Sequence, residues 1–254
     1  MTHLFKNNKH GFSIVELVIS LAITLVLLGV AIKMFNVQQD AYNSQEQVTD
    51  LHQNIRTSMD AVSREIRMAG CMVVGTSTIK TSGTSTITFL GDVDGDIVTN
   101  LVTNASAGAT TIYVSLTPDS NYSIANTDYI YISDGNHTEV VPANSSASHL
   151  IGEPDPIYLS TGLLYSYTAG SATVRTVERV TFSLDTANLR IDRDSQPLAE
   201  NIEAMSFTYG TNTATGATNT VTIAITGRTA NIDTNYGDDY RRGTLTSTIK
   251  LRNQ

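Results

Sequence analysis

The first strong pattern in the chain is an apolar stretch from Phe12 to about Ile32, broken by a single charged residue, Glu16. At about 21 residues, it is long enough to cross the roughly 30 Å hydrocarbon core of a membrane as a helix. A charged side chain at the centre of such a helix costs about 2.5–3.5 kcal/mol on insertion scales, so a retained one indicates a function. The pattern predicts a membrane-spanning helix in which Glu16 has a role of its own.

Past Lys33 the sequence becomes polar but keeps an apolar stripe at spacings of three and four, which is the spacing of one helix face. The stripe consists of Val48, Leu51, Ile55, Met59, Val62, Ile66 and Ala69. We expect one helix from about residue 12 to 69, apolar all round in its first half and amphipathic in its second. Gly70 is the expected stop. The β-rich remainder of the chain favours docking of the stripe on the same chain over a coiled-coil partner.

After Cys71 the apolar period changes from helical to two, which is typical of strands with one buried face. Clusters of Gly, Asn, Asp and Ser separate the segments and predict turns. We expect strands at 86–90, 111–116, 129–133, 138–141, 163–168, 173–184, 202–209, 220–229 and 244–252. The fold class is therefore predicted to be α+β, with a long N-terminal helix whose second half packs on a C-terminal antiparallel β domain.

Composition limits the range of functions. The 254 residues carry a net charge of −8 with a pI near 5.0, and no long basic run occurs. Nucleic acid is therefore not expected as the main partner. Cys71 is the only cysteine, which excludes an intramolecular disulfide. We expect its side chain to be buried rather than reactive.

The N-terminal residues resemble a known family. A leader carrying Lys6 and Lys9 is followed by the junction Gly11-Phe12, then by Ser13-Ile14-Val15-Glu16-Leu17 and the long apolar run. This arrangement is similar to the prepilin signature of type IV pilins and type II secretion pseudopilins. The resemblance implies that a prepilin peptidase cuts between Gly11 and Phe12 on the cytoplasmic side and methylates the new amine of Phe12. It also implies that Glu16 stays in the mature chain.

Further segments resemble one branch of that family, the PilW-type minor pilins, and to a lesser degree the GspJ-type minor pseudopilin. They are 59–71, 197–203, 205–210, 241–246 and 251–253. The middle of the chain, about 75–170, resembles nothing known to us. The resemblance implies a leader at 1–11, a membrane and assembly helix at 12–33, an amphipathic continuation at 34–70 and a β-rich exported domain at 71–254.

The same resemblance implies partners and location. Other minor and major pilins would bind through the N-terminal helix, and the prepilin peptidase and an inner-membrane assembly platform would handle the subunit. The chain would wait in the inner membrane with its C-terminal domain in the periplasm, then move to the pilus tip at the cell surface.

The charge of Glu16 suggests a hypothesis for its role in assembly. Cleavage would create an ammonium group at Phe12, and axially staggered neighbouring helices would let it meet the carboxylate of Glu16 on the next subunit. In an apolar surround such a pair is attractive, while either charge alone is costly. Glu16 would then fix the register of packing, as a buried polar residue does in a coiled coil.

Other interpretations of the N-terminus and of the function remain open. The segment is also compatible with an ordinary membrane anchor, with Glu16 at the interface, or with a secretory signal peptide cut near Gly29 and Ala31. Within the family, a type II secretion pseudopilin is the alternative to a minor pilin. From another class, the β domain is a candidate adhesin module displayed at the tip.

Catalytic and metal motifs are largely missing from the sequence. It contains no phosphate-binding loop, no dinucleotide fingerprint and no zinc-spaced Cys or His pair, so an enzyme is not expected. His52 is predicted to be solvated, and His137 and His149 fall in turn-like segments. Asp92, Asp94 and Asp96 alternate as calcium ligands do, but Ile97 replaces the glycine of a calcium-binding hand loop. A solvated acidic turn is the simpler interpretation, so the calcium site is a weak candidate.

Overall fold

The computed structural model describes residues 11, 13–73, 78–93, 98–115, 124, 128–145, 154–211, 218–233, 236–237 and 239–251. By its internal contacts the chain divides into two compact units, Met1–Thr49 and Asp50–Gln254. A single helix, α1 (Ile14–Met68), contributes to both units. Its start and end lie within two residues of the predicted limits.

The end of α1 is set by a glycine. Gly70 adopts a φ of 76°, a left-handed conformation that glycine reaches without strain and that commonly ends helices. Its N–H donates to the carbonyl oxygen of Leu90 at 2.8 Å, which ties the end of the helix to a strand. The prediction that Gly70 stops the helix is confirmed.

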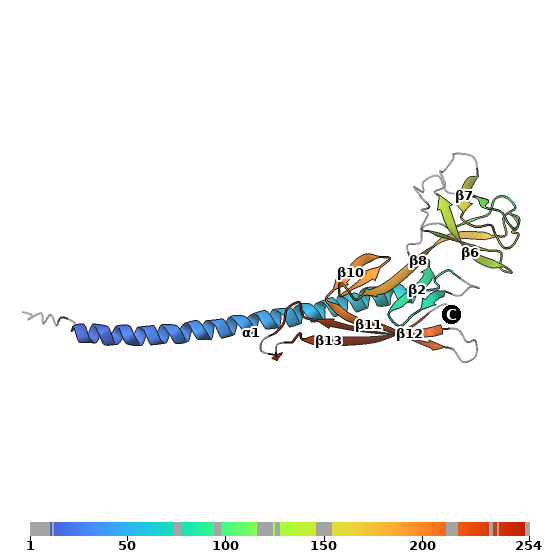
Figure 1. The fold of residues 1–254 in the computed structure, drawn as a ribbon. Coiled ribbons are helices and arrows are strands. Elements are labelled where there is room, and N and C mark those ends of the chain that lie inside the picture. Colours follow the sequence, from blue (N-terminus) through green and yellow to red (C-terminus); the bar gives the residue numbers. More distant parts are fainter. Residues whose placement is uncertain are drawn as a thin grey trace, which may run out of the picture. The chain divides into compact units, whose positions relative to one another are not determined.

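The strands form two antiparallel sheets (Figure 1). In the described residues, the larger sheet has the order β1-β2-β8-β5-β6-β7-β4, with β3 and β9 also paired to β8 and β10 paired to β9. Its strands are β1 (Ile79–Ser82), β2 (Thr86–Gly91), β3 (Val98–Asn100), β4 (Thr111–Val114), β5 (Tyr129–Ser133), β6 (Thr138–Ser145), β7 (Asp155–Leu159), β8 (Thr173–Asp185), β9 (Arg190–Arg193) and β10 (Gln196–Glu200). The smaller sheet has the order β11-β12-β13, formed by β11 (Ile202–Thr211), β12 (Thr218–Arg228) and β13 (Arg242–Lys250).

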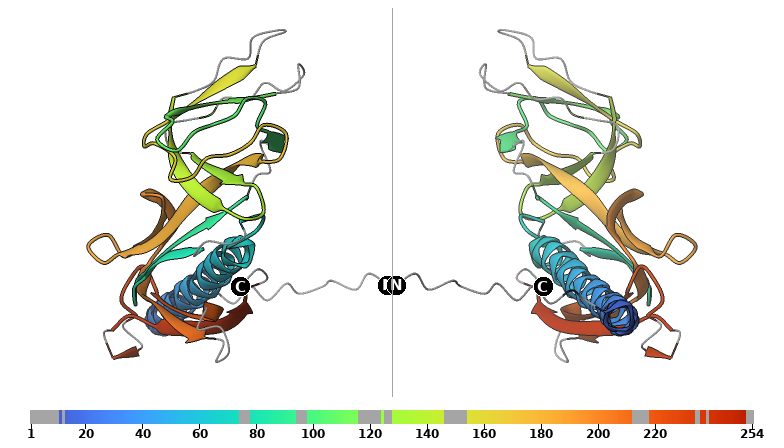
Figure 2. Two further views of the ribbon diagram at one scale, coloured as in Figure 1. Left: turned by 90° about the vertical axis from the view of Figure 1, so that its right-hand side faces the viewer. Right: turned by 90° about the vertical axis from the view of Figure 1, so that its left-hand side faces the viewer.

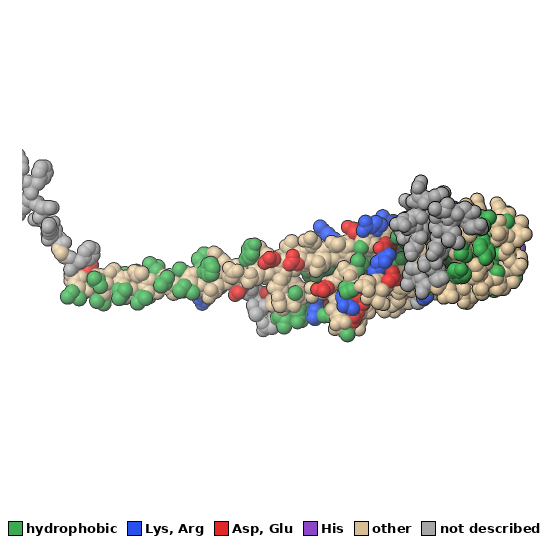
Figure 3. Space-filling view, turned by 90° about the horizontal axis from the view of Figure 1, so that it is seen from above, with side chains coloured by type: hydrophobic (Ala, Val, Ile, Leu, Met, Phe, Trp, Pro, Cys, Tyr) green, Lys and Arg blue, Asp and Glu red, His purple; other side chains and the backbone are tan. Residues whose placement is uncertain are grey.

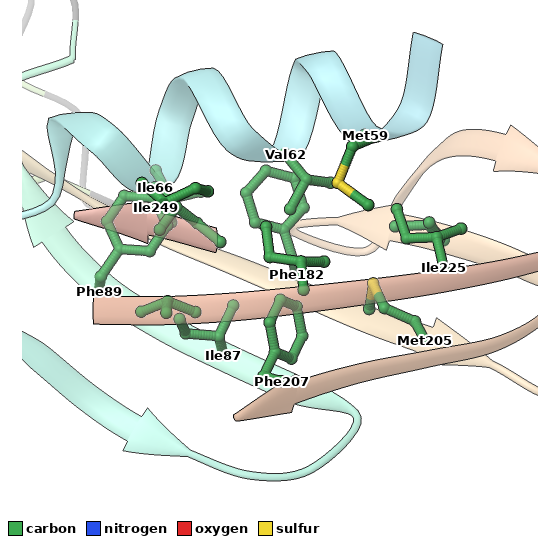
Figure 4. Packing of buried hydrophobic residues seen from close by; sticks show 14 of the residues in the cluster. Met59, Val62, Ile66, Ile87, Phe89, Phe182, Met205, Phe207, Ile225 and Ile249 are labelled. Carbon is green, nitrogen blue, oxygen red and sulfur yellow. The ribbon is translucent and has the colours of Figure 1, made fainter. Parts of the chain in front are cut away.

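One buried cluster lies between α1 and both sheets. Leu51, Ile55, Met59, Val62 and Ile66 are all buried, and they belong to the predicted apolar stripe. Figure 4 shows the helix side chains Met59, Val62 and Ile66 pointing toward those of β2, β8, β11, β12 and β13. Figure 2 shows the strands of the smaller sheet, in orange and red, beside this part of α1. The predicted α+β architecture, with a long helix on antiparallel sheets, is confirmed.

A second buried cluster belongs to a lobe inserted between β2 and β8. This inserted lobe, residues 98–172, contains β3 to β7 and has its own apolar core. Its two ends leave the helix-packed sheet next to each other, because Gly91 at the end of β2 is paired with Glu178 in β8. The first half of β8 pairs with β5, and the second half pairs with β2. A single strand therefore runs through both cores.

The strand predictions hold for the strongest alternating segments and fail elsewhere. The segment 163–168 is not a strand, and only an isolated bridge joins Tyr167 to Ala105. The reason is a tertiary contact: the backbone N–H groups of Leu164 and Tyr165 donate to the buried carboxylate of Glu139 in β6, at 2.9 and 3.3 Å. The sequence did not predict β1, β3, β7, β9 or β10.

The predicted burial of Cys71 is wrong. Its side chain is partly exposed, because the chain turns away from the helix at Gly70 and Met72 takes a left-handed φ of 59°. Val73, two residues on, takes the inward position and is buried.

Gly91 is predicted to be intolerant of a side chain. A methyl group there would lie 2.6 Å from the carbonyl oxygen of Met68, where α1 and β2 meet backbone to backbone. Gly91→Ala should therefore lower the free energy of unfolding by about 1–3 kcal/mol, as overpacking does. Chemical denaturation of the full chain in detergent measures this. Gly29→Ala is the control, since a methyl group there meets nothing within 4 Å; equal stability of the two variants would contradict the proposed clash.

Candidate functional site: the apolar half of the N-terminal helix

The first half of α1 exposes apolar side chains on all sides. Every large hydrophobic residue from Ile14 to Val37 is more than half exposed. Figure 3 shows these side chains, in green, along this part of the helix. Among the described residues, α1 is the one helix apolar and long enough to cross a membrane, with a mean hydropathy of 2.6 over an 18-residue window. Exposure of this kind requires an apolar environment, either lipid or neighbouring helices.

The hydroxyl groups of Ser20 and Thr24, inside the apolar stretch, are satisfied by the helix itself. The hydroxyl of Ser20 donates to the carbonyl oxygen of Leu17 at 2.9 Å, and that of Thr24 donates to the carbonyl oxygen of Ser20 at 2.8 Å. Such bonds spare a membrane helix the cost of an unpaired hydroxyl in hydrocarbon. Between Ile14 and Ile32, Glu16 is then the one ionisable group on an otherwise apolar surface.

Glu16 lies in the first turn of α1. The helix begins at Ile14, and the carbonyl oxygen of Ser13 accepts hydrogen bonds from the N–H groups of Glu16 and Leu17, both at 3.1 Å. Ser13 and Glu16 thus occupy the first and last positions of a capping box, Ser-x-x-Glu, a signal that the sequence reasoning missed. A carboxylate at this end also interacts favourably with the helix dipole. The Glu16 side chain is exposed and available to a neighbouring chain.

The remaining predicted processing residues are described only in part. Gly11 is exposed, which suits a cleavage site, whereas Phe12 lies outside the described residues. The cut between Gly11 and Phe12 and the methylation of Phe12 therefore stay predictions.

The acidic cluster is likewise described only in part. Asp92 is buried, and its N–H donates to the carbonyl oxygen of Cys71 at 3.1 Å. The next residue, Val93, donates its N–H to the Glu178 carboxylate at 2.6 Å. Asp94 and Asp96 lie outside the described residues, so the calcium site stays a prediction. Within the part of the chain that is described, no group of three or more His, Cys, Asp or Glu side chains could hold a metal ion.

The histidines show no clustered chemistry where they are described. His52 is exposed on α1, as predicted. His137 lies in the β5–β6 turn, 3.6 Å from the Asp134 carboxylate and stacked on Tyr165. Hydrogen bonds from the backbone N–H groups of His137 and Asn136 lower the pKa of Asp134. This arrangement stabilises a hairpin turn, and His149 lies outside the described residues.

Comparison with known proteins identifies the N-terminal segment. Residues 6–32 match the family model described as the prokaryotic N-terminal methylation motif. No curated protein and no solved structure matched the chain. The motif is the prepilin-type signature, and it marks a pilin-like or pseudopilin substrate of prepilin peptidase that assembles with other pilins. It points to a structural protein rather than an enzyme, and with the apolar helix it is consistent with membrane anchoring.

Proposed function

We propose that this chain is a minor pilin of the PilW type, a structural subunit that primes or caps assembly of a type IV pilus. The observation that carries the proposal is the match to the methylation motif at residues 6–32, which covers most of the exposed apolar half of α1. The PilW assignment rests on the finer resemblance in the second half of α1 and near the C-terminus. A GspJ-like pseudopilin of type II secretion is the alternative from the same motif.

The proposed mechanism uses the apolar half of α1 twice. Before assembly it anchors the chain in the inner membrane, with Lys6 and Lys9 on the cytoplasmic side and the β domain exported. During assembly the same surface packs against the helices of other pilins. The ammonium of the processed Phe12 and the Glu16 carboxylate of the adjoining subunit then pair in an apolar surround, where an unpaired charge is expensive. The assembly platform supplies the energy for assembly. This chain supplies the apolar surface that packs on other helices and the charge pair that sets their axial register.

Mass spectrometry of the mature chain tests the processing step. We expect a chain that begins at Phe12 and carries one methyl group on its amine. Gly11→Leu should leave the full-length precursor, because a bulky residue replaces the small one before the scissile bond. A wild-type product that begins after Ala31 would indicate a secretory signal peptide, and an uncut product would indicate an ordinary anchor. Either result would contradict the proposal.

The inserted lobe supports a second role, display of a binding surface. It carries its own core, and Tyr113 and Tyr158 are each more than 40% exposed on the outer side of β4 and β7. The register pairs Thr111 with Tyr158 and Tyr113 with Pro156, so the two rings are diagonal neighbours. An adhesin role predicts normal pili without attachment when the gene is deleted, whereas a priming role predicts loss of pili.

A further inference from the structure

The smaller sheet ends in a strand whose outer edge is open. β13 is 9 residues long and pairs with β12 in one unbroken register, from Arg228–Arg242 to Thr220–Lys250. It contains no proline. The opposite edge, β11, is partly occupied by the turn between β1 and β2. The N–H of Phe207 donates to the carbonyl oxygen of Thr84 at 2.7 Å, and the Tyr209 hydroxyl donates to the carbonyl oxygen of Gly83 at 3.0 Å. Figure 1 shows β13 at the margin of its sheet.

The hydrogen-bond pattern decides which groups of β13 point outward. The N–H of Leu251 donates to the carbonyl oxygen of Asn219, and the N–H of Thr229 donates to that of Arg241, both at 2.9 Å. In an antiparallel pair, hydrogen-bonded positions alternate along the strand. Odd-numbered residues of β13 therefore bond to β12, and the backbone N–H and C=O groups of Thr244, Thr246 and Thr248 face away from it. Within the described residues no partner meets these groups.

An exposed leucine marks the same edge. Met205, Ile225 and Leu245 form one row across the three strands on the side that faces α1. Their exposed fractions are 3%, 0% and 36%, so in this row the burial is lost at β13. Ile249, farther along β13 on the same side, is 1% exposed. The opening is therefore centred on Leu245, and one more strand beside β13 would close it.

Charge at the two ends of the edge is unequal. The guanidinium of Arg242 contacts Glu203 at 2.6 Å and Asp239 at 2.9 Å, so its charge is matched. Lys250 is exposed and forms no ion pair with any described residue. An incoming strand with a carboxylate beside Lys250 would be favoured there.

We propose that the outer edge of β13 is a strand-addition site for an extended segment of a different chain, apolar where it faces Leu245 and acidic beside Lys250. Main-chain bonds to Thr244, Thr246 and Thr248 supply affinity, and the side chains facing Leu245 and Lys250 supply selectivity. Open edges of this length are normally blocked by proline, bulges or inward charges, and β13 has none of these in its central part.

A second copy of this chain fits the edge less well than a different one. Antiparallel pairing of two β13 strands would run their α1 segments in opposite directions, although chains anchored in one membrane enter from the same side. Parallel pairing would turn one copy over and place the threonine side of its sheet next to Leu245 of the other. The apolar surface would then stay unmatched. The partner is therefore expected to be another polypeptide.

A designed peptide of the length of β13, 9 residues, tests the site. Its sequence, Asp-Val-Thr-Val-Thr-Val-Thr-Val-Thr, alternates valine for the Leu245 side with threonine for the outer side, and in antiparallel register its acid lies beside Lys250. Binding of the labelled peptide to the full chain in detergent is followed by anisotropy. Hydrogen exchange at the amides of Thr244, Thr246 and Thr248 should slow when the peptide is bound.

Matched variants separate strand addition from non-specific adhesion. Thr246→Pro should abolish binding with little change in melting temperature, because the lost N–H points outward and proline is tolerated at edges. Thr246→Val, which keeps the N–H, should bind as the wild type does. Lys250→Glu should weaken binding about fivefold. If Thr246→Pro loses its fold, a peptide N-methylated on the amides that face β13 replaces it, and it should not bind.

Three outcomes would overturn the proposal. The first is undiminished binding to Thr246→Pro or by the N-methylated peptide. The second is fast exchange at the three threonine amides at saturating peptide. The third is slow hydrogen exchange at these amides in the absence of peptide, if it becomes slower as the protein concentration rises. That result would mean that two copies of the chain pair through β13. These measurements use unprocessed purified chain, so their result is independent of the N-terminal cleavage and of the pilus assignment.

Discussion

Replacing Glu16 with alanine should leave membrane insertion intact and sharply reduce incorporation into filaments. The substitution removes a charge from the apolar segment, so insertion becomes easier. In the proposed filament it would leave the Phe12 ammonium of the adjoining subunit buried without a partner, at a cost of about 3–5 kcal/mol. Incorporation should therefore fall by at least about two orders of magnitude. Immunoblots that compare sheared filaments with the membrane fraction measure both quantities.

Glu46→Ala provides the matched control. Glu46 is an exposed glutamate on the same helix but outside the apolar stretch, so its removal should change neither insertion nor incorporation. Glu16→Gln should behave like Glu16→Ala if the charge is what matters. Normal filament content in the Glu16→Ala strain would refute the assembly role of this carboxylate and reduce Glu16 to a helix-capping residue beside Ser13.

The second large effect concerns the helix-packed core. Ile66→Ala should lower the free energy of unfolding by about 2–5 kcal/mol, because it removes a fully buried side chain and leaves a cavity. Ile66 is 0% exposed in the cluster shared by α1 and the two sheets. Denaturant titration of the full chain in detergent, followed by tyrosine fluorescence of the β domain, gives the difference.

The same substitution elsewhere on α1 separates burial from helix propensity. Ile32 is 55% exposed, so Ile32→Ala creates no cavity and should change stability by less than about 0.5 kcal/mol. If both variants lost equal stability, the loss would come from the helix and not from its packing on the sheets.

The sequence predicted the helix well because a period of 3.6 is a strong signal over many turns. Leu51, Ile55, Met59, Val62 and Ile66 repeat that period without a break, and all five are buried. Gly70 marked the end of the helix, because glycine adopts the left-handed conformation that commonly follows a helix. The long alternating segments β8, β11 and β12 were predictable for the same reason, with a period of two.

The missed elements lacked such a signal. β10 is mostly exposed and contains Pro197, so neither alternation nor composition indicates a strand. Its hairpin partner β9 is joined to it by Asp194 and Ser195, both at positive φ, where Asn-Gly would be the usual marker. The 163–168 segment alternates like a strand, but the Glu139 carboxylate binds its backbone, and only the tertiary structure brings them together.

The candidate site was predictable where it depends on a local motif. Gly11, Phe12 and Glu16 lie within six residues of each other, and their pattern is readable without a fold. The open edge of β13 could not be predicted, since it depends on which strand lies beside which. Leu245 looks like any other apolar residue in an alternating strand until the sheet is seen to stop there.

The inserted lobe occupies the place of a simple hairpin turn. The chain leaves and rejoins the helix-packed sheet at the paired residues Gly91 and Glu178, so the lobe between them can change in length and sequence while β2 and β8 stay in register. Insertions, deletions or substitutions within the lobe are thus expected to leave the shared core of α1 and the two sheets intact.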